Sequence, residues 1–231
     1  MATDVSVVIA YRDMGDPHRA QAFRYVLDWW QGLDVEIVVE SGTSDATFTR
    51  ATAINAAVTR ANGDLIIAAD PDSLVPADPS LVDALAVASA ADGLVIPHDQ
   101  YLYLTPAATA DVYGGADLWA MGPQHCEFHG RNGQGNVVVF HRSVWQKVGG
   151  LDERFPLWGG DDAAFSYATH ALVGPMVRLP GPMVHLWHHR LPQSEPGHPG
   201  YAEQFALLAQ YRDAAAQGPD AVRALVEARR V

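Results

Sequence analysis

The chain has little cysteine and little positive charge. Its 231 residues include a single cysteine, Cys126, so no disulfide can form within the chain. Lysine and arginine together number 15 against 27 acidic residues, which gives a formal net charge of -12. This charge argues against a protein that gains its affinity from positive charge spread along a nucleic acid. A small basic pocket for a diphosphate is still compatible with it, because such a pocket needs only one or two arginines.

The N-terminal region lacks the features of a targeting segment. The stretch MATDVSVVIAYRD has neither the basic start nor the long apolar core of a signal peptide. Its apolar run is much shorter than the roughly 20 residues that span a bilayer. With 48% hydrophobic and 18% charged residues, the composition is typical of a soluble globular protein. We therefore expect a cytoplasmic protein.

Strand-like and helix-like segments alternate along the first part of the chain. Short apolar runs rich in β-branched residues predict strands at 5–10, 35–41, 64–70 and 93–97. Helical periodicity occurs between them, at 16–33, 45–63 and 79–90. This alternation predicts an α/β fold with a Rossmann-like, mainly parallel central sheet flanked by helices. Ligands of such sheets bind at the carboxyl ends of the strands.

The second part of the chain is less regular. We expect strands at 136–140 and 182–190, helices at 142–150 and 161–172, and C-terminal helices over 201–231 that are broken at Gly218-Pro219. Residues 100–135 are rich in glycine, aromatic residues and histidine without a sustained period, which predicts a long irregular connection that closes over a ligand. No repeat or linker divides the chain. We expect one domain over residues 1–190, with a C-terminal loop and helical extension over 191–231 packed on it.

An Asp-Pro-Asp sequence follows the third expected strand. Asp70 and Asp72 are separated by one residue where the strand enters a turn, so both carboxylates could approach one hard cation such as Mg²⁺ or Mn²⁺. The alternative is an ordinary turn, in which Asp and Pro are common. The position after a strand of an α/β array favours the metal site.

Three histidines occur in the segment VHLWHHR. Imidazole ligands would shift a carboxylate site from Mg²⁺ toward Mn²⁺. In a continuous strand, His185 and His189 would share one face and His188 would point to the other. The alternative for each histidine is a position at the surface or a satisfied place in the core.

Arg50 lies early in the second expected helix, in TFTRATAIN. There, a guanidinium could make a bidentate contact with a diphosphate. The alternative is a solvated helix residue.

The stretch FPLWGGDDAAF places a tryptophan, two glycines and two aspartates before a helix. Asp161 or Asp162 could cap that helix, but a single cap does not need two aspartates. Glycines let the backbone approach a ligand closely, and the face of Trp158 offers a platform for a sugar ring. A partly desolvated carboxylate near other acids has the raised proton affinity of a general base.

The order of these motifs resembles nucleotide-sugar-dependent glycosyltransferases of the GT-A fold. The resemblance rests on the strand-end Arg12, FTRA, Asp-x-Asp, GGLDERF, WGGDD and VHLWH, and it covers roughly residues 4–190. It is greatest to the family 2 enzymes and to the β-1,4-galactosyltransferase and polypeptide N-acetylgalactosaminyltransferase group.

The resemblance implies a role for each of a set of residues. For the nucleotide and donor sugar these are Arg12, Glu40, Phe48, Arg50, Asp70, Gly135 and Asn136. For the metal they are Asp70, Asp72 and His185, with His188 as the rival third ligand. For the acceptor side they are Trp158, Gly159 and Gly160, and for catalysis Asp161, where the family more often has Glu, and Asp162 as the general base.

The resemblance also implies a reaction. Asp rather than Asn at position 162 implies inversion at the sugar carbon, with a divalent metal, Mn²⁺ before Mg²⁺, on the leaving diphosphate. We expect a UDP-sugar as donor and a saccharide or another hydroxyl compound as acceptor, and the acidic charge argues against a nucleic acid acceptor. The alternatives are a sugar-phosphate nucleotidyltransferase and a non-catalytic nucleotide-sugar-binding protein. The first would need a Gly-rich basic loop after the first strand, which AYRDMGDPHRA matches poorly.

Overall fold

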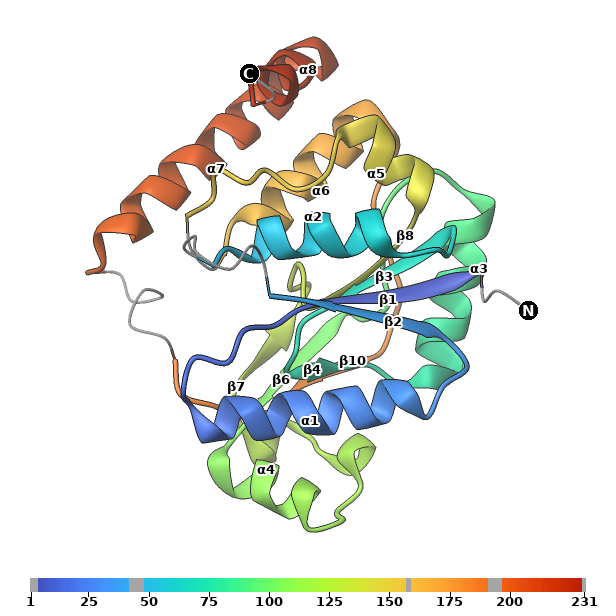
Figure 1. The fold of residues 1–231 in the computed structure, drawn as a ribbon, viewed down its shortest axis with the longest axis vertical. Coiled ribbons are helices and arrows are strands. Elements are labelled where there is room, and N and C mark those ends of the chain that lie inside the picture. The colour runs from blue at the N-terminus through green and yellow to red at the C-terminus, as the bar shows by residue number, and fades with distance from the viewer. Residues whose placement is uncertain (1–3, 42–47, 157–158, 191–196, 230–231) are drawn as a thin grey trace.

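The protein folds around a six-stranded central sheet with the strand order β2-β1-β3-β8-β5-β9 (Figure 1). The computed structural model describes residues 4–41, 48–156, 159–190 and 197–229. The strands are β1 (Val5–Ala10), β2 (Glu36–Glu40), β3 (Leu65–Ala69), β5 (Val95–Ile96), β8 (Val137–His141) and β9 (Val177–Arg178). β1 and β3 consist almost entirely of buried residues, as strands covered on both faces require.

All strands of this sheet run parallel to one another except β8, which lies antiparallel between β3 and β5. The expected α/β fold with a mainly parallel sheet is therefore confirmed. The reversed direction of β8 has a consequence for the site, because β8 begins at the edge where β1 and β3 end. The backbone N–H of Asp70 donates to the carbonyl oxygen of Asn136 at 2.7 Å across this edge.

A second, four-stranded sheet has the order β4-β10-β6-β7. Its strands are β4 (Ser73–Leu74), β6 (Gln100–Leu104), β7 (Cys126–Arg131) and β10 (Pro182–His185). The expectation of an irregular connection over 100–135 is wrong, because this segment contains β6, β7, α4 (Pro106–Tyr113) and the helical turns η2 (Leu118–Ala120) and η3 (Pro123–His125). Leu102, Leu104 and Val112 pack in the core. No single period holds across elements this short, which is why the sequence pattern missed them.

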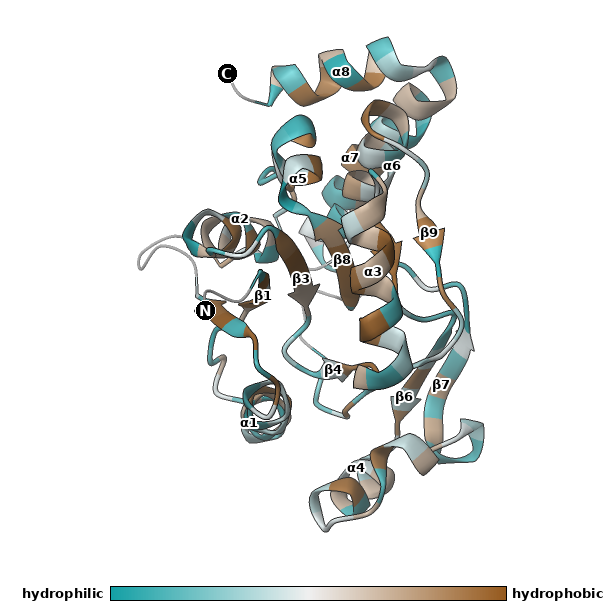
Figure 2. Cartoon of the chain, turned by 90° about the vertical axis from the view of Figure 1, so that its right-hand side faces the viewer, coloured by the Kyte–Doolittle hydropathy of each residue, from teal (hydrophilic) through white to brown (hydrophobic). Residues whose placement is uncertain are grey.

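Helices cover both faces of the central sheet (Figure 1). On one face lie α2 (Arg50–Arg60), α5 (Arg142–Val148) and α6 (Asp161–Leu172), and on the other α1 (Pro17–Gln31) and α3 (Val82–Ala90), which follows the short turn η1 (Ala77–Leu81). Alternate residues of β1 enter the two cores, with Val8 in the first and Val7 in the second. Figure 2 shows the hydrophobic character of the inner strands β3 and β8 between these layers.

Helix α2 begins at Arg50, close to the carboxyl edge of the sheet. Thr49 is its N-cap, and the Thr49 hydroxyl accepts a hydrogen bond from the backbone N–H of Thr52. The helix expected from residue 45 thus starts at residue 50, and residues 42–47 lie outside the described part of the chain. This start places Arg50 in the first turn, which faces the carboxyl ends of the neighbouring strands.

The C-terminal helices α7 (Pro199–Gln217) and α8 (Pro219–Ala228) are separated at Gly218-Pro219, as expected. Leu207, Tyr211 and Val226 belong to the same core cluster as the buried face of α2. The Tyr211 hydroxyl also donates to Asp152 Oδ2 at 2.8 Å, in the loop that precedes α6. Among the described residues, no helix combines the length and the apolar character that a membrane span needs.

Candidate active site

A cavity of about 740 Å³ opens at the carboxyl ends of β1 and β3, the edge where ligands of such sheets bind. Its walls come from the loop after β1, the first turns of α1 and α2, the turn between β3 and β4, the second sheet and the segment after β10. The residues predicted for the site that line this cavity are Arg12, Phe48, Arg50, Asp70, Asp72, Asn136, His185 and His188. The fold therefore brings together motifs that lie far apart in the sequence.

Three side chains in this cavity could hold a metal ion. Asp72, His185 and His188, named here the Asp72 trio, offer one ligand atom each within 4.8 Å of the others. Asp72 Oδ1 lies 3.4 Å from Nε2 of His185, and Asp72 Oδ2 lies 3.0 Å from Nε2 of His188. A carboxylate with two imidazoles is a mixed donor set, which disfavours Mg²⁺ because Mg²⁺ prefers oxygen ligands.

The expected orientation of the histidines is wrong, because β10 ends at His185. A strand through residue 190 would have placed His188 on the opposite face from His185. Instead, the chain leaves the sheet and the backbone N–H of Leu186 donates to the carbonyl oxygen of Asp72 at 2.8 Å. The turn brings His188 back to Asp72, so the two histidines that were rival candidates lie at one site. His189 lines the cavity outside the trio.

The hydrogen bonds of His188 direct a lone pair at Asp72. Its Nδ1 lies 2.8 Å from the carbonyl oxygen of His189, and because a carbonyl only accepts, Nδ1 carries the hydrogen. In the neutral ring, the lone pair of Nε2 then points at the negatively charged Oδ2 of Asp72, and the two repel each other. Only a proton or a metal cation between the two atoms removes this repulsion. This arrangement fits a cation between the two side chains.

The pKa values of the trio result from burial and from the contacts among its three side chains. Burial opposes the charge of Asp72, but the facing imidazoles of His185 and His188 hold its pKa well below the usual value. Burial lowers the pKa of His185 to about 4, so this ring is neutral and able to bind metal near neutral pH. Burial is the largest influence on His188 and acts to lower its pKa, but the hydrogen bond to Asp72, the charge of Asp72 and the hydrogen bond to the His189 carbonyl together outweigh burial and raise the pKa of His188.

Arg50 holds three carboxylates together beside the trio. Its Nε donates to Asp70 Oδ1 at 2.8 Å, and its Nη1 donates to Asp161 Oδ2 at 2.8 Å and to Asp162 Oδ1 at 2.6 Å. Burial opposes the charge of Arg50, which is 8% exposed, yet the carboxylates raise its pKa well above the usual value. Asp70 therefore lies with Arg50 and outside the Asp72 trio. The bidentate diphosphate contact expected of Arg50 meets a guanidinium whose Nε and Nη1 are already engaged.

Asp162 has a raised proton affinity. Burial is the main cause, and the negative charges of Asp161 and Asp70 add to it against the opposing charge of Arg50, which together raise the pKa of Asp162 to about 7. The side chain is 25% exposed in the first turn of α6. A Cβ at Gly135, where φ is +82°, would lie 2.2 Å from Asp162 Oδ2, so the chain passes this carboxylate at a distance that only glycine allows.

Asn136 and Glu40 are both predicted to bind the donor nucleotide sugar, but they lie in different places in the structure. Asn136 lines the cavity and its side-chain amide donates to Ser73 Oγ at 3.2 Å, which joins β8 to the turn that carries Asp72. Glu40 forms an ion pair with Arg60 and is not among the described residues that line the cavity. Asp161, Asp162 and Gly135 are not among the described residues that line the cavity, but both aspartates are hydrogen-bonded to Arg50, which does line it.

The acceptor-side glycines lie at the start of α6. Gly160 is the N-cap residue with φ +89°, and a Cβ there would lie 2.9 Å from the ring of Phe155. Gly159, with φ +99°, precedes it. Neither glycine is among the described residues that line the cavity. Trp158 lies outside the described residues.

The cavity also contains residues that the motifs did not single out. Tyr103 and Phe128 come from the second sheet, Arg19 from the first turn of α1, and Trp187 and Arg190 from the segment after β10. The signal for Arg19 is its position, since the first turn of a helix that follows β1 lies near the carboxyl edge. The signal for Tyr103 and Phe128 is the aromatic content of 100–135. Tyr103 stacks on His185 with 4.2 Å between ring centroids.

The family model described as the N-terminal domain of galactosyltransferase matches residues 119–189. This range contains β7, β8, the Asp161-Asp162 pair and both histidines of the trio. No curated protein shows significant sequence similarity to the chain.

Several solved structures that are similar in fold to this chain are glycosyltransferases. The catalytic domain of Drosophila β1,4-galactosyltransferase 7 in complex with xylobiose is 17% identical, with a TM-score of 0.55 over 87% of this chain and 79% of that one. The mannosyltransferase PcManGT from Pyrobaculum calidifontis, in complex with GDP-Man and Mn²⁺, is 19% identical, with a TM-score of 0.56 over 97% and 68%. GalNAc-T7 with UDP, GalNAc and Mn²⁺ is 13% identical, with a TM-score of 0.54 over 91% and 49%. The resemblance to the GT-A fold is thereby confirmed, and the matched galactosyltransferase domain supports a glycosyltransferase.

Proposed function

We propose that the chain is a metal-dependent, inverting glycosyltransferase that moves a sugar from a nucleotide-diphosphate sugar to an acceptor hydroxyl. The observation that carries this proposal is the connection of two sites by one arginine. The first site is the Asp72 trio, which would hold the cation, and Asp72 is two positions after Asp70 in the sequence. The second site is Asp162, which would accept the proton. Arg50 links the two sites because it is hydrogen-bonded to both Asp70 and Asp162. Sugar transfer needs charge neutralisation on the leaving group and a base for the acceptor, held in a fixed relation.

Mn²⁺ is the metal that we propose, held by Asp72, His185 and His188. The mixed donor set of the trio favours it over Mg²⁺, and two enzymes of the same fold are in complex with a nucleotide or nucleotide sugar and Mn²⁺. When bound, the cation would supply positive charge to the diphosphate of the donor. We keep a UDP-sugar as the first donor, because GalNAc-T7, an enzyme of the same fold, is in complex with UDP and GalNAc.

Asp162 acts as the base in this proposal. Its carboxylate accepts the proton of the acceptor hydroxyl while the acceptor oxygen forms a bond to the anomeric carbon of the donor sugar. The bond from that carbon to the β-phosphate oxygen breaks, and its electron pair leaves with the nucleoside diphosphate. A pKa of about 7 matches this task, because the group is both ionised and basic near neutral pH. Arg50 holds the carboxylate in position through its 2.6 Å hydrogen bond.

A saccharide is the acceptor class that we propose. Phe128 lines the cavity and is 53% exposed, so it offers an aromatic face for a sugar ring. Glu127 lines the same cavity and could accept hydrogen bonds from sugar hydroxyls. One enzyme of the same fold is in complex with xylobiose, which agrees with this choice.

Thermal unfolding with added nucleotides tests this function. UDP with Mn²⁺ should raise the unfolding midpoint, since a ligand at about 100 times its Kd stabilises by roughly 2.7 kcal/mol. EDTA and the Asp72→Ala variant should each abolish the shift. Asp28→Ala, at an exposed position of α1, is the control that should keep it.

Two results would contradict the proposal. Absence of a shift with UDP, GDP or their sugars, in Mn²⁺ as in Mg²⁺, would rule out the transferase function. A shift that persists undiminished in Asp72→Ala would show that the trio is not the metal site.

A further inference from the structure

Resting on the proposed transferase function, we propose that Arg19, rather than Arg50, is the side chain that binds the diphosphate of the donor and neutralises it as it leaves. The assignment depends on three observations. The Nε atom of Arg19 is buried without a hydrogen-bond partner in the described part of the chain, other arginines of the cavity already have contacts, and α1 is attached to residues 185–190, which we call the histidine segment.

Arg19 lines the cavity together with Asp72 and His188, from the first turn of α1. Its Nε atom is buried and has no hydrogen-bond partner among the described residues. A buried N–H group without an acceptor costs the free energy of its lost hydration, and folded proteins leave few of them. Arg19 lines the cavity, so a change of its side-chain rotamer would let the oxygens of a phosphate supply the missing acceptor, which the planar guanidinium suits.

The other arginines of the cavity are less suited to this role. Arg50 donates from Nε and Nη1 to three carboxylates, so a bidentate contact with a diphosphate through either atom would require it to give up hydrogen bonds. Arg12 lies over the ring of Phe48, 5.4 Å from its centroid, so its guanidinium is already engaged in a cation–π contact. Arg190 is exposed at the end of the histidine segment. Among the described arginines that line the cavity, Arg19 is the one with a buried, unsatisfied donor.

Arg19 lies in the same cavity as the trio. Asp72, His185 and His188 line the cavity wall together with Arg19. A donor diphosphate at this place would therefore have a cation on one side and a guanidinium on the other. Two positive groups can share the charge of both phosphates.

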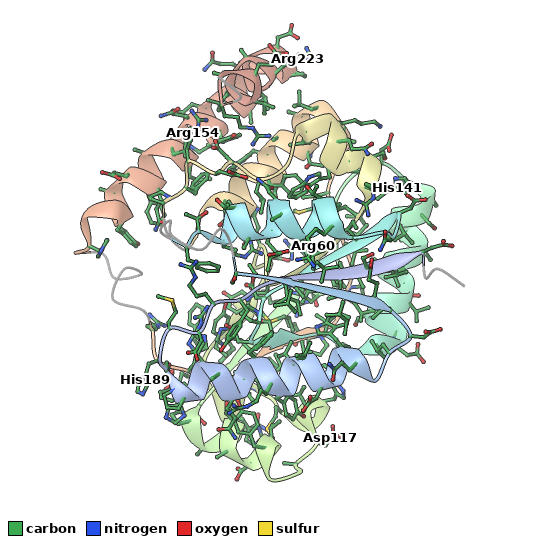
Figure 3. All side chains as sticks on the ribbon, in the orientation of Figure 1. Arg60, Asp117, His141, Arg154, His189 and Arg223 are labelled. Carbon is green, nitrogen blue, oxygen red and sulfur yellow. The ribbon has the colours of Figure 1, made fainter. Side chains whose placement is uncertain are left out.

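The position of Arg19 relative to the trio is held by the chain itself. Asp16, the N-cap of α1, accepts a hydrogen bond from the backbone N–H of His189 at 3.1 Å. The start of α1 is thus attached to the segment that carries His188, and Figure 3 shows His189 beside this end of the helix. Arg19 follows one turn later on the same helix, so the guanidinium and the metal ligands are placed together before a ligand binds.

The chemical role follows from the charge that develops. As the bond from the sugar carbon to the β-phosphate oxygen breaks, the electron pair stays on that oxygen and the nucleoside diphosphate gains negative charge. Hydrogen bonds from Nε and the Nη atoms of Arg19 strengthen as this charge grows, which stabilises the transition state more than the ground state. No further reactant is needed.

Calorimetric titration of three variants with uridine, UMP and UDP in the presence of Mn²⁺, and with GDP in parallel, tests the inference. Arg19→Ala should weaken UDP binding by about tenfold or more, which corresponds to the loss of a charged hydrogen bond. Uridine binding should stay within twofold of the wild type, which excludes a folding defect. Arg19→Lys should recover part of the loss, because it restores the charge without the guanidinium. Arg24→Ala, which removes the same charge from the exposed side of α1, should bind UDP like the wild type.

The outcomes separate this inference from the function on which it rests. If the wild type binds UDP or GDP with Mn²⁺ and Arg19→Ala binds within twofold of it, the Arg19 assignment fails while the transferase function stands. If Arg19→Ala loses uridine and UDP binding equally, Arg19 acts on the fold of the cavity and the assignment fails as well. If the wild type binds neither diphosphate, both the function and the assignment fail.

Discussion

Asp162 illustrates how one residue can depend on several distant ones. Its carboxylate is in contact with the guanidinium of Arg50 and lies close to Asp161 and Asp70, so a single positive charge faces three negative ones. An isolated aspartate at a helix start would have a low pKa, because the helix dipole favours its charge. Here, burial and the neighbouring carboxylates outweigh that effect and raise the pKa to about 7.

The rate of sugar transfer should therefore rise with pH through about 7, because Asp162 accepts a proton only when it is ionised. Asp162→Asn should lower kcat by about 10² to 10⁴ and remove this inflection from the pH profile. Asp220→Asn, at the matching first-turn position of α8, should change neither. A profile that keeps its inflection in Asp162→Asn would show that another group is the base.

The same pKa predicts an effect on stability. Since Asp162 binds its proton more tightly in the folded state than in the unfolded one, its contribution to stability is full below about pH 4 and is lost as pH rises to about 7. At pH 8, Asp162→Asn should accordingly be at least as stable as the wild type in thermal unfolding. A clear loss of stability in the variant would mean that the ion pair with Arg50 outweighs the cost of burying the charge.

At the scale of elements, the site depends on the turn that leads into β8. The chain turns from β7 into β8 through Gly135 and Asn136, both with positive φ. This turn brings the backbone against Asp162 and at the same time bonds Asn136 to the end of β3 through Asp70. The turn that leads into the antiparallel strand β8 therefore sets where Asp162 lies relative to the cavity.

Gly135→Ala should reduce activity by more than its effect on stability explains. The variant has a strained positive φ and a Cβ 2.2 Å from Asp162 Oδ2, which forces the base to move. Gly115→Ala is the matched control, because Gly115 also has positive φ, +100°, but nothing within 4 Å of an added Cβ. Thermal unfolding and initial rates would be measured for both. Equal activity in the two variants would show that the close approach at Gly135 does not matter for catalysis.

At the scale of the whole molecule, two cores lie on the two faces of the central sheet. The C-terminal helices contribute to the first of them through Leu207, Tyr211, Val222 and Val226, all buried. This core also packs beneath α2 and α6, the helices that carry Arg50 and Asp162. The division of the chain at residue 190 stays a prediction, but the extension supports the helices of the site.

Removal of residues 197–231 should therefore prevent cooperative unfolding, since it exposes the apolar face that α7 and α8 cover. Circular dichroism during heating would compare the shortened chain with the full one under the same conditions. A shortened chain that unfolds cooperatively with a midpoint within a few degrees of the full chain would show that residues 1–196 form a complete core.

The parts of the site that could be predicted from sequence are those that a local pattern determines. Buried runs such as VSVVIA and LIIAA can form only strands covered on both faces, and parallel connections bring their carboxyl ends to one edge. Asp70 and Asp72 follow β3 directly, so their position at this edge was predictable. The helix break at Gly218-Pro219 is also a local signal.

The sequence by itself thus determined the α/β fold, the acids at the strand ends and the resemblance to GT-A enzymes. Only the tertiary structure decided which of these groups touch one another. The turn that brings His188 to Asp72 and the engagement of Arg50 by Asp161 depend on contacts between residues more than 100 positions apart. The direction of β8 depends on its pairing with β3, which is also distant in the sequence. Periodicity and propensity describe each segment alone, whereas these contacts are selected by the packing of the whole chain.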